Sequence, residues 1–317
     1  MDFIGVDLGA TEIKAGIVSE DGQIIDKTAV HTPVKDGIHA IVNSIDMLID
    51  ALLKTHNKTI QSIKCIGVGI PGVCDNKGLV YYAPNLFWNN VPLGDLLRVK
   101  TGVPVFIEND ATVAIIGEAT CGIARGASDY VLITLGTGIG SGIVINNSVY
   151  NGSHGIGSEI GHMIVGENFY NCNCGNNGCL ETFASATALV KYTKKLLMDS
   201  DDSLISKMVD NVDTLDAKLV FDCAKKDDLI AGKAVDRLVK YLAIGIGNII
   251  NILDPEMIII GGGISKAGNY LIEKLNREIP KNIWLKPMNL TKIVQASLGN
   301  DAGIIGSASY AKSKLNL

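Results

Sequence analysis

The sequence predicts an α/β protein with mixed sheets, built from two related halves. Three Ile- and Val-rich runs near the amino terminus alternate as strands do, namely Phe3–Val6, Ile13–Ser19 and Gln23–Thr32, and the Asp-Gly pair between the last two is typical of a hairpin. Strand and helix patterns then alternate along the chain, which is the order of an α/β domain. A strand, a glycine turn and a second strand return at residues 130–146. We therefore expect an internal duplication.

Hydrophobic spacing places the remaining elements. Apolar residues between Ile38 and Leu52 keep the i, i+3, i+4, i+7 spacing of one buried helical face. The other expected strands are Ile63–Ile70, Val103–Ile107, Tyr130–Leu135, Ser141–Asn146 and Met257–Ile260. The other expected helices are Asp110–Thr120, Leu180–Met198, Ala217–Lys225, Asp228–Leu253 and one that begins near Ala302.

Composition excludes several classes of protein. A chain of 317 residues with 47% hydrophobic residues is long enough for about two domains with real cores. Its net charge of −5 argues against nucleic acid as the main partner. No cationic leader and no apolar run of about 20 residues is present, so we expect a cytoplasmic protein with no membrane partner. The odd number of cysteines, seven, disfavours a disulfide framework. Four of them are expected to be small buried residues: Cys65, Cys74, Cys121 and Cys223.

Two glycine turns, at residues 7–11 and 136–140, look like two copies of one device. Backbone N–H groups of such turns can hold a polyphosphate, and Thr11 and Thr137 add hydroxyl donors. Asp7, at the end of a strand, is placed to hold Mg²⁺ through waters. A third glycine cluster, at 261–263, follows a buried strand. Two other phosphate-binding patterns fail: no Walker loop occurs, and Gly67–Gly72 runs into turn residues where a dinucleotide fingerprint needs a helix.

The segment Glu108-Asn-Asp-Ala111 lies where a strand ends and a helix begins. One interpretation is ordinary capping of that helix by Asn109 or Asp110. In the other, Asp110 is a general base, kept ionised by the helix N-terminus, and Asn109 donates to a substrate. The spacing alone leaves both interpretations open.

One histidine and three cysteines have the composition of a tetrahedral Cys₃His zinc site. These residues are His162, Cys172, Cys174 and Cys179, and Gly175 and Gly178 let the loop wrap around a metal. A site closed by four protein ligands is structural, because it leaves no open position for water. Glu159 and Glu181 flank the loop and are candidates to bind the hydroxyls of a sugar.

These motifs, in this order, resemble the ROK (repressor, open reading frame, kinase) family of sugar kinases, and its bacterial glucokinase branch in particular. The similarity covers essentially the whole chain. It lies in the segments Asp7–Lys14, Glu108–Ala111, Leu135–Gly142, Glu159–His162, the Cys-x-Cys-Gly-x-x-Gly-Cys-Leu-Glu run that ends at Glu181, and Gly261–Gly263.

The resemblance implies an actin-like ATPase (ribonuclease H-like) fold with two lobes around an active-site cleft. Residues 1–115 with 300–317 would form a small N-terminal lobe, and 116–299 a larger lobe with the zinc loop. Asp110 would take the proton of a hexose 6-hydroxyl, most simply that of glucose, as the oxygen attacks ATP. The implied sugar ligands are Gly72, Asn85, Asn109, Asp110, Glu159, His162 and Glu181. The implied nucleotide ligands are Asp7, Gly9, Thr11, Lys14, Gly136, Thr137, Gly138, Gly261, Gly262 and Gly263.

Departures from the family pattern and other functions qualify these expectations. Ala10 stands where the family usually has glycine, and Glu12 where lysine or asparagine is common, so Glu12 is not counted as a phosphate ligand. The alternative substrate is N-acetylmannosamine or another N-acetylhexosamine, and the alternative phosphoryl donor is polyphosphate. A fructokinase lacks support in the zinc loop, and a repressor would need a DNA-binding domain before Asp7. The different-class alternative is a non-catalytic sugar sensor. A homodimer is implied.

Overall fold

A computed structural model describes residues 2–199, 202–209, 211–288 and 290–315. The chain forms two compact units by its internal contacts. The first comprises Met1–Ala127, Asn147–Gly157 and Ser297–Leu317, and the second comprises Ser128–Asn146 and Ser158–Ala296. The boundaries at residues 115 and 299 that were expected for the two lobes stay a prediction.

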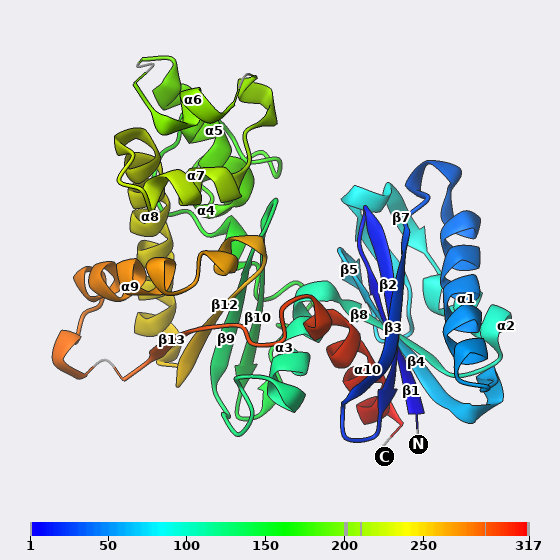
Figure 1. Cartoon of the computed structure of the whole chain (residues 1–317). Helices are drawn as coiled ribbons and strands as arrows, with labels where there is room; N and C mark the ends of the chain where they lie inside the picture. The colour runs from blue at the N-terminus through cyan, green and yellow to red at the C-terminus, as the bar shows by residue number, and fades with distance from the viewer. Residues whose placement is uncertain (1, 200–201, 210, 289, 316–317) are drawn as a thin grey trace. The chain divides into compact units, whose positions relative to one another are not determined.

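The first unit is built on a five-stranded sheet in the order β3-β2-β1-β4-β8 (Figure 1). Its strands are β1 (Asp2–Leu8), β2 (Glu12–Ser19), β3 (Ile24–His31), β4 (Ile63–Ile70) and β8 (Val105–Asn109). Strand β2 is antiparallel to β1 and β3, whereas β4 is parallel to β1 and to β8. The carboxyl ends of the three parallel strands therefore share one edge, which holds Asp7 and the start of the Asp110 helix.

Helices cover both faces of this sheet (Figure 1). On one face are α1 (Ile38–Thr55) and α2 (Leu93–Thr101), and on the other are α3 (Asp110–Cys121) and α10 (Ala302–Lys314). Helix α10 approaches the strands so closely that a Cβ at Gly67 would lie 1.8 Å from the backbone oxygen of Ser307. Glycine is required at that contact, which explains part of the Gly67–Gly72 pattern without a nucleotide.

A small sheet of β5 (Val73–Cys74), β6 (Val80–Ala83) and β7 (Trp88–Val91) completes the first unit. This sheet was not predicted, because its strands are only two to four residues long. Gly72 leads directly into β5, so no helix follows the glycine pattern, as expected.

The second sheet has the order β11-β10-β9-β12-β13. Its strands are β9 (Tyr130–Leu135), β10 (Ile139–Ile145), β11 (Ser148–Val149), β12 (Met257–Gly261) and β13 (Lys292–Gln295). Strand β9 is antiparallel to β10 and parallel to β12, as β1 is to β2 and β4. Thr134 pairs with Gly140 and Gly261, just as Asp7 pairs with Lys14 and Gly69. The shared order and register confirm the duplication.

The helices of the second unit are α4 (Glu181–Ala184), α5 (Ala186–Leu197), α6 (Leu204–Met208), α7 (Ala217–Ala224), α8 (Leu229–Leu253) and α9 (Asn269–Glu278). The long helix α8 shares a hydrophobic core with Ile133, Ile258 and Ile260 of the sheet. The single helix expected over Leu180–Met198 is wrong. It breaks at Ser185, which has extended backbone angles and whose side chain caps α5 by accepting from the Ala188 N–H.

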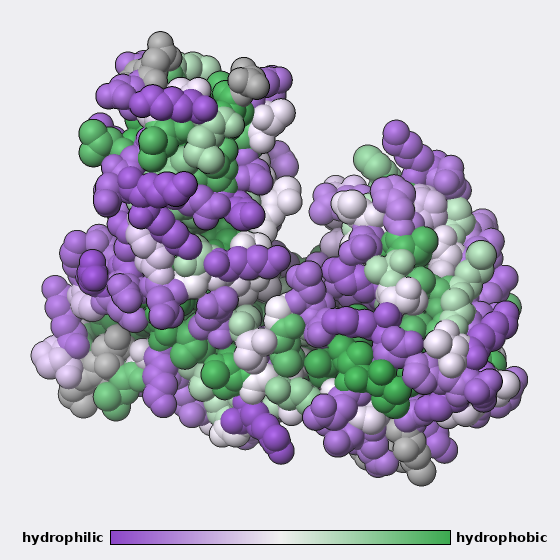
Figure 2. All heavy atoms as spheres, in the orientation of Figure 1, coloured by the Kyte–Doolittle hydropathy of each residue, from purple (hydrophilic) through white to green (hydrophobic). Residues whose placement is uncertain are grey.

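Hydrophilic side chains cover most of the face of each unit shown in Figure 2. Among the described helices, none is long and apolar enough to cross a membrane. Cys65 and Cys223 are fully buried, as expected. The expectation of full burial is wrong for Cys74 and Cys121, which are partly exposed. Cys121 lies against the β2–β3 turn, where its Sγ is 3.5 Å from the Gly22 carbonyl oxygen.

Candidate active site and metal site

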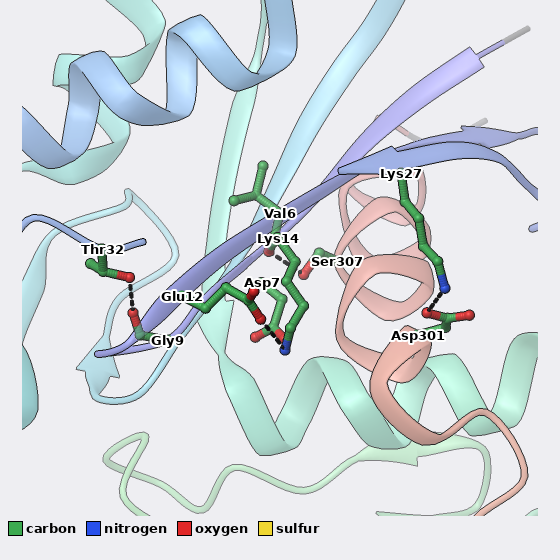
Figure 3. Close-up of polar contacts among 9 residues, drawn as sticks. All are labelled: Val6, Asp7, Gly9, Glu12, Lys14, Lys27, Thr32, Asp301 and Ser307. Atoms are coloured by element: carbon green, nitrogen blue, oxygen red, sulfur yellow. Dashed lines mark hydrogen bonds and ion pairs between the residues drawn. The ribbon is translucent and has the colours of Figure 1, made fainter. Parts of the chain in front are cut away.

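The first glycine turn joins β1 to β2 at the parallel-strand edge (Figure 3). The Gly9 N–H donates to the Glu12 carbonyl at 3.0 Å, and the Thr32 hydroxyl donates to the Gly9 carbonyl at 2.7 Å. Ala10 has no positive φ, so this turn accommodates alanine without backbone strain. The turn lines a cavity of about 510 Å³, with Gly9, Ala10, Thr11, Glu12, Lys14 and His31 in its wall.

Asp7 lies beside this turn and pairs with Lys14, whose Nζ is 3.4 Å from the Asp7 Oδ2 (Figure 3). Burial raises the pKa of Asp7, although the nearby Lys14 ammonium acts in the opposite direction. The Glu12 carboxylate is half-exposed and 3.9 Å from the same ammonium group. Helix α10 closes the other side, because a Cβ at Gly303 would lie 2.9 Å from the Asp7 Cγ. Asp7 is thus a confined carboxylate with a cation close to it.

At the junction of β8 and α3, Asn109 caps the helix, as the first of the two interpretations predicts. The Asn109 Oδ1 accepts from the N–H groups of Ala111 and Thr112 at 3.0 and 3.2 Å. Its Nδ2 donates to the Gly72 carbonyl at 3.1 Å. Asp110 is the first residue of α3. Capping does not exclude the catalytic interpretation, because it fixes Asp110 at a helix N-terminus, where a carboxylate is stabilised.

Gly72 connects this segment to the small sheet. A Cβ at Gly72 would lie 2.4 Å from the Tyr82 carbonyl oxygen and 2.8 Å from the Ala83 Cβ. Asn85 follows two residues later in a short 3₁₀ helix, Pro84–Leu86, with its side chain exposed. The first unit therefore brings Gly72 into contact with Asn109 next to Asp110, and places Asn85 on the adjacent loop.

The second glycine turn joins β9 to β10. The Gly136 N–H donates to the Gly138 carbonyl at 2.9 Å, and the Ala186 N–H donates to the Gly136 carbonyl at 2.8 Å, so α5 begins at this turn. The third glycine cluster lies against this turn. Gly262 has a φ of 80°, and a Cβ there would lie 2.5 Å from the Leu135 carbonyl oxygen.

These glycines line a cavity of about 500 Å³ within the second unit. Gly136, Thr137 and Gly263 form part of its wall. The sequence analysis missed the rest of the wall, which comes mainly from α7 and the segment after β12: Ala186, Asp216, Ala217, Lys218, Phe221, Asp222, Lys225, Ile264, Lys266 and Ala267. No motif marks these residues, since α7 has the pattern of an ordinary amphipathic helix. Three lysines beside two glycine turns suit a phosphorylated ligand.

The four predicted metal ligands converge. One ligand atom from each of His162, Cys172, Cys174 and Cys179 lies within 4.8 Å of all the others. The Cys172 Sγ is 3.7 Å from the His162 Nδ1, and the Cys174 and Cys179 sulfurs are 3.6 Å apart. A tetrahedral zinc ion with bonds of about 2.3 Å holds its ligand atoms about 3.8 Å apart, so the donor set and its spacing fit zinc.

Local backbone features favour metal binding in this loop. A backbone N–H bond from Asn176 lowers the pKa of Cys174 to about 7, which favours the thiolate form that binds metals. Gly175 and Gly178 have φ values of 95° and 90°, as their expected role in wrapping the loop requires. A Cβ at Gly178 would lie 1.9 Å from the Gly166 carbonyl oxygen.

The two flanking glutamates have different surroundings. The Glu181 Oε2 accepts from the Ile139 N–H of the second glycine turn at 2.9 Å, and its Oε1 is 3.8 Å from the Cys172 Sγ. Glu159 is exposed and directly precedes the 3₁₀ helix Ile160–His162. The second unit thus gathers Glu159, His162 and Glu181 around the metal ligands and the turn.

Two duplicated mixed sheets, each with a glycine turn at its first hairpin, define the actin-like ATPase fold. The ROK family model matches residues 3–314, and the chain belongs to the ROK family. It is 39% identical to a glucokinase of Thermotoga maritima over 99% of this chain and 98% of that protein. It is 38% identical to a glucokinase of Halalkalibacterium halodurans over 99% of this chain and 96% of that protein.

A solved structure of a ROK family glucokinase is also similar to this chain. The ROK family glucokinase of Streptomyces griseus, in complex with glucose and AMPPNP, superposes with a TM-score of 0.85 at 32% identity. The match covers 99% of this chain and 100% of that one.

Proposed function

We propose that this protein is a sugar kinase that transfers the γ-phosphoryl group of ATP to the 6-hydroxyl of glucose. The observation that carries the proposal is the position of Asp110 at the first turn of α3, on the sheet edge that also ends at Asp7. A base and a candidate magnesium ligand at one edge, beside a glycine turn, are the parts that phosphoryl transfer needs. The similarity to two glucokinases at 38% and 39% identity supports glucose as the sugar.

In the proposed reaction, the Asp110 carboxylate accepts the proton of the 6-hydroxyl. The hydroxyl oxygen forms a bond to the γ-phosphorus, and the bond from that phosphorus to the bridging oxygen breaks, so ADP leaves with the electron pair. The N-terminus of α3 stabilises a negative charge on the Asp110 side chain. General-base catalysis of this kind contributes about 10²–10⁴-fold to the rate.

The other residues predicted from the sequence take binding roles in this proposal. The sugar is bound by Gly72, Asn85, Asn109, Glu159, His162 and Glu181. The nucleotide is bound by Gly9, Thr11, Lys14, Gly136, Thr137, Gly138, Gly261, Gly262 and Gly263, and Asp7 holds Mg²⁺. The cavity of about 500 Å³ beside Gly136 and Gly263 adds Lys218, Lys225 and Lys266 to the candidates for nucleotide binding.

Zinc is proposed to be structural here. When bound, it cross-links the four ligands and supplies no open position for chemistry. Since the His162 Nδ1 faces the Cys172 sulfur, the metal leaves the Nε2 edge of the ring to donate to a sugar hydroxyl. The homodimer that the resemblance implies stays a prediction, testable by sedimentation. The cytoplasmic location, which was expected from the sequence, also stays a prediction.

The test is ATP-dependent phosphorylation of glucose, mannose, N-acetylglucosamine, N-acetylmannosamine, fructose and allose, with Asp110→Asn beside the wild type. A second arm replaces ATP by polyphosphate. Strong turnover of glucose, reduced by about 10²-fold or more in the variant, supports the proposal. A preference for an N-acetylated sugar keeps the mechanism and changes the substrate. No turnover of any sugar contradicts kinase activity and leaves a sugar sensor.

A further inference from the structure

Arg237 of α8 has surroundings that the proposed function does not use. Its guanidinium carbon lies 4.3 Å from the ring centroid of Tyr192, 4.7 Å from that of Phe183, 5.4 Å from that of Tyr241 and 5.8 Å from that of Phe169. Each distance is within the range of an attractive cation–π contact, and such contacts are strongest where water is excluded. Four rings therefore surround one cation.

Its polar contact is an amide rather than a carboxylate. The Arg237 Nη2 donates to the Asn168 Oδ1 at 2.7 Å. Among the described residues, no carboxylate forms an ion pair with Arg237. Burial also lowers the pKa of the guanidinium group, a sign that its charge is partly desolvated. A cation in this setting depends on the rings and on Asn168.

Asn168 lies within the segment that carries all four metal ligands, residues 162–180, which we call the metal loop. Its backbone N–H donates to the Asn177 Oδ1 at 2.8 Å, and the Asn177 Nδ2 donates to its carbonyl at 2.9 Å. Asn177 lies between Cys174 and Cys179. The Asn168 Nδ2 donates to the Thr182 carbonyl at 2.7 Å, next to Glu181. Asn168 therefore contacts both arms of the metal loop and the start of α4.

The rings around Arg237 reach the same parts of the chain. Phe169 lies between His162 and Cys172, Phe183 is two residues after Glu181, and Tyr192 and Tyr241 come from α5 and α8. Helices α4, α5 and α8 pack on one another in the second unit (Figure 1). The Phe183 and Tyr241 rings stack with centroids 3.8 Å apart. One side chain thus joins the metal loop to the helices beneath it.

We propose that Arg237 is a positioning residue that holds the metal loop, through Asn168 and Phe169, in the arrangement in which its four ligands converge. The inference rests on the proposed metal site. Arg237 touches neither sugar nor nucleotide and acts by keeping the arms of the loop together. Loss of an outer partner of a metal site typically costs about 10–100-fold in metal affinity. Arg237→Met removes the cation and the donor but keeps a long apolar side chain.

The experiment measures zinc in the full chain purified without chelator, and the rate at which a colorimetric chelator removes it. We expect about one zinc per wild-type chain and release about 10-fold faster or more from Arg237→Met. Lys195→Met is the matched control, because Lys195 lies 4.6 Å from the same Phe169 ring but does not contact Asn168. It should release zinc at the wild-type rate. Arg237→Lys, which keeps the charge, should be intermediate.

A second variant keeps the inference testable if Arg237→Met does not fold. Asn168→Ala breaks the same link from the loop side and should also speed zinc release, and the double variant should release zinc no faster than the faster single one. Any rise in the KM for sugar in Arg237→Met should be reversed by excess zinc. If either Arg237→Met or Asn168→Ala releases zinc at the wild-type rate, the role of Arg237 is overturned and the metal site itself stands. A wild-type chain that binds no zinc overturns the metal site and this inference with it.

Discussion

The Glu181 carboxylate accepts a hydrogen bond from the backbone N–H of Ile139 at 2.9 Å, so the residue after the metal loop is attached to the second glycine turn. Glu181 begins α4, and its other oxygen lies near the Cys172 sulfur. The hydrogen bond from Ile139 fixes the direction of one carboxylate oxygen. In the proposed function, this is how a sugar ligand, a metal ligand and a phosphate-binding turn share one local structure.

Gly138→Ala tests that attachment. A Cβ at residue 138 would lie 2.4 Å from the Glu181 Oε2, which is the end of a flexible side chain, so the carboxylate moves and the fold remains. We expect the KM for glucose at saturating ATP to rise by about 10-fold, which corresponds to the loss of a hydrogen bond to a charged group of about 1.4 kcal/mol. Gly232→Ala is the control, because no atom lies within 4 Å of a Cβ there and Gly232 belongs to no proposed binding set. An unchanged KM in Gly138→Ala would contradict the role of Glu181.

Asp7→Asn should stabilise the protein while it abolishes magnesium-dependent activity. Because burial raises the pKa of Asp7, the folded chain binds the proton more tightly than the unfolded chain does. The ionised carboxylate therefore opposes folding above its raised pKa, and this cost is absent below the ordinary value near 3.8. Urea unfolding without magnesium should show Asp7→Asn more stable than the wild type at pH 7.5, with the difference lost at about pH 4. A variant less stable at pH 7.5 would show that the Lys14 pair dominates.

Gly303→Ala and Gly232→Ala form a matched pair in two helices. Alanine in place of glycine usually stabilises a helix by up to about 1 kcal/mol. At Gly232 of α8 no atom lies within 4 Å of the added Cβ, so we expect this gain in thermal stability. At Gly303 of α10 the added Cβ meets Asp7, a short side chain anchored on β1, so the gain should vanish. We also expect a lower kcat and a higher magnesium requirement. Equal behaviour of the two variants would refute the confinement of Asp7 by α10.

Substitutions of Asn109 separate its capping role from its proposed role in sugar binding. Serine is as good an N-cap as asparagine, whereas alanine costs about 1 kcal/mol at such a position. Asn109→Ser should therefore unfold near the wild-type temperature and Asn109→Ala at a lower one. Both lack the amide nitrogen, so both should show a raised KM for glucose. If Asn109→Ser had wild-type kinetics, Asn109 would be a cap and nothing more.

Much of the fold could be predicted because strong local patterns agree with the final packing. The Asp21-Gly22 hairpin and the amphipathic α1 are examples, since the turn residues and the buried face are visible in the sequence. Ser185 shows the limit, because the apolar pattern continues through Leu180–Met198. The chain breaks at Ser185, which caps α5, and the Ala186 N–H bonds to Gly136, a contact between distant residues that the pattern does not show. The sheet of β5, β6 and β7 was missed because strands of two to four residues are too short to show a periodic pattern.

The candidate site was predictable where chemistry imposes a spacing. Four soft ligands in one loop are such a case, and the structure brings them together. Within the second unit, the glycines after β9 and β12 also meet. The cavity wall at α7 was not predictable, because no motif marks Lys218 and Lys225 and only the fold places them at the cavity. The contact between Gly303 and Asp7 was hidden for another reason: it joins residues almost 300 positions apart.

That long-range contact has a consequence for synthesis. Strand β1 and its Asp7 carboxylate leave the ribosome early, but the helix that packs on β1 and β4 is made after the whole second unit. Until then the sheet face at Gly5 and Gly67, which α10 covers in the folded protein, has no cover. A chain arrested before residue 302 exposes this face to water. Nascent chains of this protein should therefore depend on a chaperone, or on the speed of translation, during the interval before α10 appears.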